Sequence, residues 1–545
     1  MIHKRIEKKG SKMEKITSDA LNDFRHAIGT GNVIVDNKIR SKYQTATFAT
    51  QQNIPAILRP GNRNEVQTCL RIANSHKTPI YPISTGKNIG YGSRVPIMGG
   101  TIVMELSRLD KIVEYNDKLG YVTLQPGVTQ QMLYNFLQKN KAKFWMDATG
   151  GPMDHSIIGN IAERGFGHTP YGDHFAHVSG MEVVLPNGDC IHTGYGRFKG
   201  AKATPIYRWG VGPFIDGLFT QSNLGIITQL TVWLMPAPAY SQSFYFSLTK
   251  YEDLAATIDA LRPLFLDGTI KCAMHIANDY KVLSSFQRYP WDKTKGQTPL
   301  PDHILHDLGK SWDFGAWNAA GALYGTKQEV ALARKKIKRQ LRKVPIKKLR
   351  FLDDFMLKMA EKFQQPLKWI LRLDFPEMLK VLKPVYNLTK GVPSDEFIPS
   401  LYWRKPLQIK QPIDPERDRC GLMWIAPIAP TDGLYAAEIW EITKSVFTQY
   451  NYEPAISITL LTERAMDSII SISYDRDIPG EDEKAMRCHD ELLKKLADKG
   501  YFPYRLGIQS MGKLPKPEAA YLAFIKILKQ TLDENGILSP SRYSQ

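Results

Sequence analysis

A glycine-punctuated loop at residues 82–92, PISTGKNIGYG, constrains this sequence more than any other feature. It follows a β-branched and aromatic run, TPIYPI, which predicts a strand. Gly86 and Gly90 leave the backbone accessible, and successive N–H groups in such a loop form an anion-binding nest suited to a diphosphate. The loop is not a P-loop, because Tyr81 and Asn88 stand where that motif needs glycine and Ser or Thr. A plain structural turn remains the alternative.

Two further segments combine glycines and polar side chains with a following strand. Residues 159–189 are interrupted repeatedly by glycine and end in a predicted hairpin whose turn is Asn187-Gly188. Residues 216–238 place a Ser-Asn pair ahead of Gly225 and a β-branched run. Each pattern indicates a close approach of backbone to something flat or phosphorylated.

Together these segments resemble the FAD domain of the vanillyl-alcohol oxidase / p-cresol methylhydroxylase family. The matching stretches are PISTGKNIGYG, GNIAERGFGHTPYGDH, GMEVVLPNG and SNLGIITQLTVWLMP. The resemblance continues through GALYG, APIAP, PYRLGIQSM and DENGILSP, so it covers nearly the whole chain and looks closest to the 4-alkylphenol branch. It implies an α+β, two-domain fold. The FAD domain would comprise residues 1–237, with its core at about 50–237, and a C-terminal return at 500–545, while residues 238–499 would form an inserted α+β cap.

The resemblance implies FAD as the cofactor and assigns residues to it. The implied cofactor-binding residues are Pro82, Ser84, Thr85, Gly86, Lys87, Asn88, Gly90, Gly159, Asn160, Gly167, Thr169, Ser222, Gly225 and Ile227, the last near the adenine or ribose end. Many relatives anchor FAD covalently through a cap histidine or tyrosine. Leu422 stands at the histidine position, so non-covalent FAD is expected, with nearby Cys420 as a speculative anchor.

The family's phenolate-binding residues match Tyr91, Tyr504 and Arg505 here. A guanidinium and two phenolic O–H groups favour the phenolate anion, from which hydride leaves the para-benzylic carbon more easily. The hydride would go to flavin N5, leaving a quinone methide that water can attack. Without the resemblance, these residues would be interpreted as a packed turn tyrosine and a surface strand.

Each of the other candidate residues has two possible roles. Asp147 lies near the position of the family's active-site aspartate and is a possible base, as is Asp154, or either is a plain loop carboxylate. His168 is a proton acceptor or a structural histidine. Tyr402 and Arg404 would line the substrate pocket, or form an exposed strand end. No metal is predicted, because the Asp-His-Phe-Ala-His run at 173–177 fits no metal-ligand spacing.

Charge and cysteine content limit the classes of protein to which this chain can belong. Lys plus Arg exceed Asp plus Glu by 72 − 54 = 18, and ten of the seventeen residues at 334–350 are basic. That segment predicts a helix with a solvated basic face, or one that docks a cytochrome or other electron acceptor. Helices are expected at 251–264, 327–343, 354–363, 434–450, 481–498 and 516–535. Five scattered cysteines and no apolar run of eighteen residues favour a cytoplasmic protein without a membrane span.

The sequence therefore predicts an FAD-dependent oxidoreductase for a para-substituted phenol or aromatic alcohol, passing electrons to O₂ or a cytochrome-like carrier. A homo-oligomer is implied by the resemblance alone. The same flavoenzyme acting on a non-phenolic alcohol or hydroxy acid remains an alternative, because the cap builds the pocket. A basic nucleic-acid or membrane-surface binding protein is a remote one, since the charge is clustered and no nucleic-acid motif is present.

Overall fold

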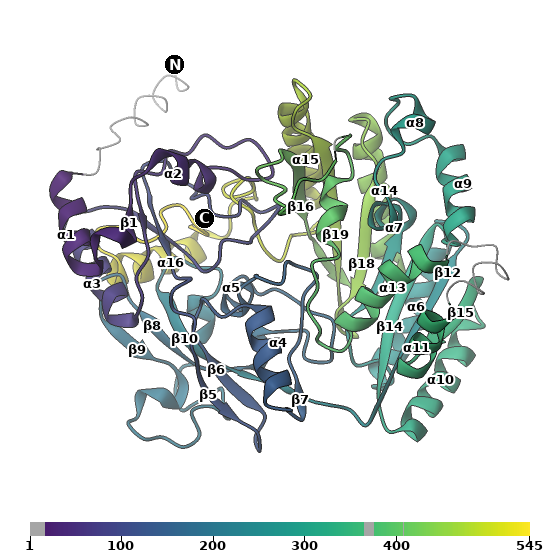
Figure 1. Ribbon diagram of the computed structural model, residues 1–545, viewed down its shortest axis with the longest axis horizontal. Helices are drawn as coiled ribbons and strands as arrows, with labels where there is room; N and C mark the ends of the chain where they lie inside the picture. The colour runs from purple at the N-terminus through teal and green to yellow at the C-terminus, as the bar shows by residue number, and fades with distance from the viewer. Residues whose placement is uncertain (1–16, 364–374, 407, 545) are drawn as a thin grey trace.

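Two units lie side by side in the computed structural model, which describes residues 17–363, 375–406 and 408–544 (Figure 1). The first holds the N-terminal residues, and the second, the cap, begins at the strand after Pro236. The predicted first domain thus includes residues 1–16, which lie outside the described residues. No helix in the described part of the chain has the length and apolar character needed to cross a membrane.

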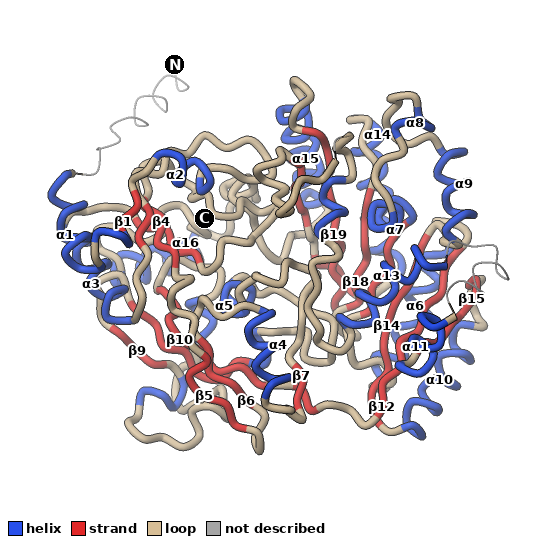
Figure 2. The backbone as a smooth tube through the Cα atoms, viewed as in Figure 1, coloured by secondary structure: helices blue, strands red, loops and turns tan. Residues whose placement is uncertain are grey.

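The N-terminal unit contains two main sheets (Figure 2). The first has the order β1-β2-β4-β3, and the second the order β5-β6-β10-β8-β9, with β11-β7 as a separate pair. The strands are β1 (Val33–Ile34), β2 (Ile57–Leu58), β3 (Ile80–Ile83), β4 (Ile102–Glu105), β5 (Ile112–Asn116), β6 (Tyr121–Leu124), β7 (Phe144–Trp145), β8 (Val178–Val184), β9 (Cys190–His192), β10 (Ile226–Trp233) and β11 (Met235–Pro236). The predicted hairpin is confirmed as β8–β9.

Helices cover these sheets because their apolar residues recur at helical spacing. In α3, Val66, Leu70 and Ala73 are fully buried, and the Asn62 side chain caps the helix by accepting from the Glu65 N–H. The helices and short 3-10 turns of this unit are α1 (Ser18–Ile28), η2 (Thr30–Asn32), α2 (Asn37–Tyr43), α3 (Arg63–Ser75), α4 (Gln130–Lys139), α5 (Ile157–Ala162), η3 (Phe175–His177), η4 (Gly194–Arg197), η5 (Asp216–Phe219) and the late α16 (Ala519–Leu532).

The cap is one large antiparallel sheet with helices on both faces. Its order is β15-β12-β14-β13-β18-β19-β16, and β17 also pairs with β19. The strands are β12 (Tyr240–Leu248), β13 (Met274–Asn278), β14 (Trp317–Gly325), β15 (Ile346–Leu352), β16 (Cys420–Ile425), β17 (Ile428–Pro430), β18 (Ala455–Leu460) and β19 (Ala465–Asp475).

One group of cap helices packs together behind the sheet and shares its apolar core. These are α6 (Asp253–Leu266), α10 (Lys327–Leu341), α14 (Gly433–Gln449) and α15 (Glu481–Asp498). The others lie on or beside the opposite face: α7 (Asp279–Phe286), α8 (Trp291–Thr294), α9 (Asp302–Trp312), α11 (Asp354–Lys362), α13 (Phe375–Leu388) and η6 (Ile398–Tyr402). The helices expected at 251–264, 354–363, 434–450, 481–498 and 516–535 are confirmed within three residues at either end.

The cap sheet has one apolar and one polar face, because strand side chains alternate. Met274 and Ile276 of β13 enter the helix-covered core, while His275 between them points the other way. In β19, Ile470 enters the core and Asp467 faces outward. The polar face is the one turned toward the N-terminal unit's glycine-rich loops, where the site described below is formed.

The helix expected at 327–343 is confirmed as α10, and the basic segment at 334–350 is divided between this helix and a strand. Helix α10 ends at Leu341, and the chain turns at Pro345 and returns as the edge strand β15. Val330, Ile337 and Leu341 are buried as the helical spacing predicted, but Val344 lies in the turn. Helix propensity and apolar spacing both stop at the proline, which lacks an N–H and disfavours a helical residue before it.

The C-terminal residues return to the N-terminal unit. Ile80 of β3 donates its N–H to Ile537, and Ser539 donates back to Ile80, both at 2.8 Å. Leu538 forms a parallel bridge beside the same strand. These contacts agree with the implied C-terminal contribution to the first domain.

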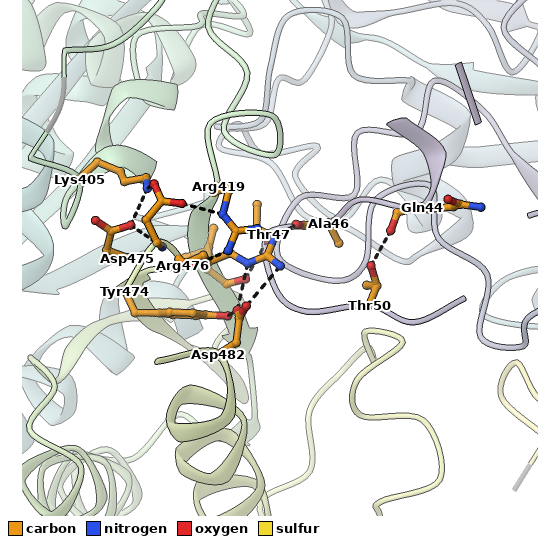
Figure 3. Close-up of polar contacts among 12 residues, drawn as sticks. Gln44, Ala46, Thr47, Thr50, Lys405, Arg419, Tyr474, Asp475, Arg476 and Asp482 are labelled. Carbon is orange, nitrogen blue, oxygen red and sulfur yellow. Dashed lines mark hydrogen bonds and ion pairs between the residues drawn. The ribbon is translucent and has the colours of Figure 1, made fainter. Parts of the chain in front are cut away.

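Ala46 and Thr47 of the N-terminal unit also contact the cap (Figure 3). The Leu422 N–H donates to the Thr47 carbonyl and the Thr47 hydroxyl donates to the Leu422 carbonyl, both at 2.8 Å. Arg476 donates to the Ala46 carbonyl at 2.6 Å and pairs with Asp482 at 2.9 Å. These bonds set the position of β16 relative to the first unit.

Candidate active site

A cavity of about 590 Å³ lies where the polar face of the cap sheet meets the N-terminal unit. The first unit contributes the loops around Asn88, Gly150 and Gly167. The cap contributes side chains from several strands and from α7. Of the residues predicted for the site, the cavity is lined by Lys87, Asn88, Tyr91, Asn160, Gly167, His168, Tyr504 and Arg505.

The loop after β3 offers free backbone donors beside this cavity. The N–H groups from Thr85 to Gly90 donate no hydrogen bond to any described residue. Such a row of unpaired N–H groups fits a diphosphate, which supplies the missing acceptors. Lys87 lies in the loop and pairs with Asp154 at 2.6 Å. The loop therefore has the chemistry of an anion cradle rather than of a self-satisfied turn.

The glycine-lined segments meet at this loop. Ser156, which caps α5, donates its backbone N–H to the Thr85 hydroxyl at 3.2 Å. A side chain on Gly159 would overlap the Ser84 hydroxyl, and one on Gly167 would overlap the Asp147 carboxylate. The glycines are thus required by close approach between segments, in addition to any ligand.

The third segment lies next to the end of α5. Gln221 donates its N–H to Ala162 at 2.8 Å and its side chain to the Tyr504 carbonyl, also at 2.8 Å. Ser222, Gly225 and Ile227 do not line the large cavity, and Ile227 is buried in the apolar core of the first unit. Pro82 likewise lies within β3, paired with Met104.

Tyr91, Tyr504 and Arg505 converge at one end of the cavity. The Arg505 guanidinium carbon lies 3.9 Å from the centre of the Tyr91 ring and 5.6 Å from that of Tyr504. The Ile508 N–H donates to the Tyr91 carbonyl at 3.0 Å, and the Tyr504 N–H donates to Ala426 at 3.1 Å, so backbone bonds hold both segments. Tyr91 is far in sequence from the adjacent Tyr504 and Arg505, and the fold brings the three into one cluster.

The charges of this cluster suit an anionic ligand. Burial raises the pKa of Tyr91 and of Tyr504, although Arg505 acts in the opposite direction, so both remain O–H donors at neutral pH. The guanidinium is charged at any ordinary pH, and its Nε has no partner among described residues. One fixed cation and two donors therefore face the cavity.

Both carboxylate oxygens of Asp147 are engaged by the loop at 167–174, which favours the loop carboxylate of its two predicted roles over the base. Its Oδ1 accepts from the N–H groups of Thr169 at 2.6 Å and His168 at 3.2 Å, and its Oδ2 lies 2.5 Å from His174 Nε2. Burial alone raises the pKa of Asp147, but the bonds from His174 and Thr169 outweigh it and hold the pKa below its usual value. Asp147 does not line the large cavity. Its acceptor capacity is used to hold the 167–174 loop.

The histidines of the 173–177 run are also engaged by the protein. His174 Nδ1 lies 2.6 Å from Asn160 Oδ1, opposite its contact with Asp147. The His177 ring stacks on Tyr171 at 4.0 Å between centres. Both rings thus have structural contacts.

His168 lines the cavity, as a proton acceptor there would require. Its ring lies 4.6 Å from that of His275, between centres. Burial lowers the pKa of both, that of His275 to about 3, so the pair is neutral at physiological pH. The neutral His168 ring can accept a hydrogen bond from a ligand in the cavity, while the His168 backbone N–H donates to Asp147.

Three polar residues of the cavity wall were missed by sequence reasoning. His275 Nε2 and Asp467 Oδ1 have no hydrogen-bond partner among described residues. Burial raises the pKa of Asp467 to about 7, although Arg505 acts to lower it. Burial lowers the pKa of His155 to about 4. A lone polar residue at alternate positions of an apolar strand, as in MHIAN and AMDSII, is the signal that marks the first two.

Tyr402 and Arg404 do not line the cavity, contrary to the prediction. Both are buried in the cap. The Tyr402 hydroxyl donates to Asp418 at 2.6 Å, and Arg404 pairs with the equally buried Glu453 at 2.7 Å. Ile398, Ser400 and Leu401 of the preceding 3-10 turn line it instead.

Comparison with known proteins places this architecture among flavoproteins. The FAD binding domain family matches residues 54–194. The chain is 30% identical over 533 residues to the flavoprotein subunit of 4-cresol dehydrogenase (hydroxylating) from Pseudomonas putida, covering 96% of this chain and 94% of that one. It is 41% identical over 524 residues to 1'-carboxy-chondrochloren decarboxylase of Chondromyces crocatus, covering 96% of each.

Solved structures agree with these matches. The fold superposes on substrate-bound p-cresol methylhydroxylase with a TM-score of 0.85 at 29% identity, covering 97% of this chain and 98% of that one. It superposes on 4-ethylphenol oxidase from Gulosibacter chungangensis, in complex with isoeugenol, with a TM-score of 0.86 at 27% identity and the same coverage. The chain belongs to the p-cresol methylhydroxylase family of FAD-dependent oxidoreductases.

FAD fits the residues present. The unpaired N–H groups of the 85–90 loop suit its diphosphate, and the glycine-lined edge at Gly150 and Gly167 leaves room for a flat ring in the cavity. Bound there, FAD supplies the hydride acceptor. The N–H groups of the 85–90 loop would hold the cofactor's diphosphate.

Proposed function

We propose that this enzyme oxidises a para-substituted phenol at its benzylic carbon. The observation that carries the proposal is the convergence of Tyr91, Tyr504 and Arg505 at one end of the cavity. Their positive charge and two O–H donors stabilise a phenolate by charge and hydrogen bonding, which activates the para-benzylic C–H bond. Loss of hydride from that bond leaves a quinone methide.

His168 and His275 are neutral and line the cavity. His275 keeps an Nε2 on the cavity side of β13 that has no partner among described residues. Because burial holds the pKa of both rings below the usual value, they act as hydrogen-bond acceptors for the phenol or an attacking water rather than as bases that take its proton. Asp147 holds the loop that presents His168.

A second candidate reaction is oxidative decarboxylation, since one relative is named as a decarboxylase. If the carbon next to the benzylic one carries a carboxylate, the quinone methide can lose CO₂. The electron pair of the broken C–CO₂ bond forms the side-chain double bond, and the ring oxygen regains its negative charge. The products are a 4-vinylphenolate and CO₂, the hydride having passed to the flavin. A lysine in the cavity wall, Lys281, favours this candidate, because a carboxylate there would meet a cation.

Anaerobic mixing of the FAD-loaded enzyme with a panel of phenols tests both reactions. We expect 4-alkylphenols or 3-(4-hydroxyphenyl)propanoate to bleach the flavin absorbance, whereas matched O-methyl ethers, which cannot form a phenolate, should react at least ~100-fold more slowly. Release of CO₂ in step with bleaching marks the decarboxylating route. If no phenol in a broad panel bleaches the flavin, the phenol assignment is wrong and the non-phenolic alternative gains.

We also propose that FAD is held without a covalent bond. Leu422 lines the cavity and has no nucleophilic atom, while Cys420 is fully buried and does not line it. Burial raises the pKa of the Cys420 thiol to about 12, so it is not a thiolate. Acid precipitation of the yellow protein is expected to leave the colour in the supernatant. Colour retained in the pellet contradicts this proposal.

The electron acceptor and assembly state remain predictions. The exposed cations of α10 and β15 lie on the side of the cap remote from the N-terminal unit (Figure 1), where an acidic carrier protein has access. Some of that charge is already balanced, as Lys336 is by Asp267 at 2.8 Å. A homo-oligomer and a cytoplasmic location likewise stay predictions.

A further inference from the structure

Lys281 is a cation in the cavity wall that the hydride-transfer chemistry leaves unused. It lies in the first turn of α7, where the Asn278 side chain caps the helix by accepting the Lys281 N–H. Its Nζ lies 3.4 Å from the Ser471 hydroxyl oxygen and 4.3 Å from the centre of the Trp424 ring. Burial lowers the pKa of Lys281 to about 8. The ammonium group thus ends against a neutral hydroxyl and an aromatic face.

No ion pair between residues of the described ranges involves Lys281. Other buried cap cations do have one: Arg404 pairs with Glu453 at 2.7 Å and Lys405 with Asp475 at 2.5 Å. Burying an ammonium without a counter-ion costs free energy, part of which an anionic ligand would restore.

The surroundings decide from which side such an anion can arrive. A small chamber next to Lys281, lined also by Ser284 and Ser473, has a volume of about 20 Å³. That is room for a water molecule and too little for a carboxylate with its carbon chain. An anion that meets Lys281 must therefore occupy the 590 Å³ cavity, which Lys281 also lines.

Strand β19 sets the separation between Lys281 and Arg505. Asp467, which is electrostatically coupled to Arg505, and Ser471, which contacts Lys281, lie on the same face of this strand. They are four residues apart, so at about 3.3 Å per residue their side chains leave the strand roughly 13 Å apart. A phenol ring with a short carbon chain and a terminal carboxylate is of this length once a hydrogen bond of about 2.8 Å is added at each end.

We propose that Lys281 is a second substrate anchor, which binds a carboxylate on the para side chain of the phenol held by Arg505. The inference rests on the proposed phenol-oxidising function and adds to it the charge and length of the substrate. Binding at Lys281 makes or breaks no covalent bond. It places a two-ended anion across the cavity, with the benzylic carbon between its anchors.

The exposed edge of the cavity also favours anionic ligands. Lys348 and Arg350 of β15 line it with side chains about half exposed, and both pair with the single carboxylate of Asp313. This edge therefore carries net positive charge, which raises the local concentration of anionic substrates.

Matched ligand pairs test the anchor with the FAD-loaded enzyme. The probes are 3-(4-hydroxyphenyl)propanoate and 4-(4-hydroxyphenyl)butanoate, each compared with the 4-alkylphenol of equal chain length. Their Kd values are measured by calorimetry on dithionite-reduced enzyme, which cannot oxidise them. The wild type is expected to bind at least one acid ~10-fold or more tightly than its neutral partner, as one charge-assisted hydrogen bond provides.

Lys281→Met is expected to abolish that preference while changing the Kd of the alkylphenol by less than about 3-fold. Lys281→Arg keeps the charge and should keep part of the preference. Lys499→Met, which removes an exposed lysine paired with Glu438 at 3.0 Å, is the matched control and should behave as the wild type.

Two results would overturn the anchor. One is a wild type that binds acids no more tightly than alkylphenols. The other is a Lys281→Met variant that loses affinity for both kinds of ligand equally, or loses FAD, because Lys281 would then serve the fold or the cofactor. Flavin bleaching by alkylphenols without any preference for acids removes this inference alone. Failure of every phenol to bind or bleach removes the proposed function with it.

Discussion

Replacing Arg505 by methionine is expected to slow anaerobic flavin reduction by a phenol by about 100- to 1,000-fold. The guanidinium is the only fixed positive charge that the described structure places within 4 Å of the Tyr91 ring. Removing one donor to a developing anion costs about 2.7–4 kcal/mol in transition-state stabilisation, which corresponds to that range. Methionine fills much of the same volume, so packing around Tyr504 is largely kept. Rapid-mixing absorbance at the flavin band measures the rate.

Two companion variants separate chemistry from folding. Arg505→Met also deprives the buried Asp467 of its nearby cation, so Arg505→Met/Asp467→Asn removes both charges and should restore any lost thermal stability without restoring the rate. Arg505→Lys keeps the charge but not the planar fork and should fall between wild type and methionine. A methionine variant that reduces its flavin at the wild-type rate would exclude Arg505 from the site.

Asp147→Ala is expected to lose most of its bound FAD and to melt at a lower temperature, whereas Asp147→Asn should keep both. Alanine leaves two backbone N–H groups and the His174 ring without their buried partner, a local cost of about 3–5 kcal/mol. Asparagine still accepts from His168 and Thr169 through Oδ1, and its amide can donate to His174. FAD retained after desalting and the melting temperature report the difference.

The comparison between alanine and asparagine distinguishes a loop carboxylate from a base. If Asp147 removed a proton during turnover, both variants would reduce flavin equally slowly, because neither side chain can take a proton. A loop carboxylate predicts that Asp147→Asn, reconstituted with FAD, reduces within about 10-fold of the wild type. Equal and severe losses of rate in both variants, with FAD fully bound, would restore the role of base.

The sequence identified residues whose chemistry can be recognised from the residue type and its near neighbours in the chain. The loop at 82–92 has glycines and no competing motif, and its N–H groups prove to be unpaired. Tyr91, Tyr504 and Arg505 were assigned through resemblance, and the structure brings them together at one cavity end. Asp147 was predicted as a base or a loop carboxylate, and its contacts with His168, Thr169 and His174 are ones that no local pattern reveals.

The errors have a common physical origin. Tyr402 and Arg404 looked like pocket residues because aromatic and basic side chains often are, but Asp418 and Glu453 hold them inside the cap. The basic run at 334–350 was interpreted as the face of a helix, but its last residues form the edge strand β15. In each case a contact or a break elsewhere outweighed the local preference.

By itself, the sequence determined the family and the cofactor, because these depend on short motifs whose order along the chain is visible. The tertiary structure alone decided which side chains form the opposite wall. His275 lies on β13 and Asp467 on β19, two strands that flank β18 in the cap sheet although they are far apart in the chain. Lys281 lies on α7, the helix that follows β13. Strand alternation selects the face each strand residue occupies, but register and partner strand decide what lies opposite, and both are set by packing of the whole cap.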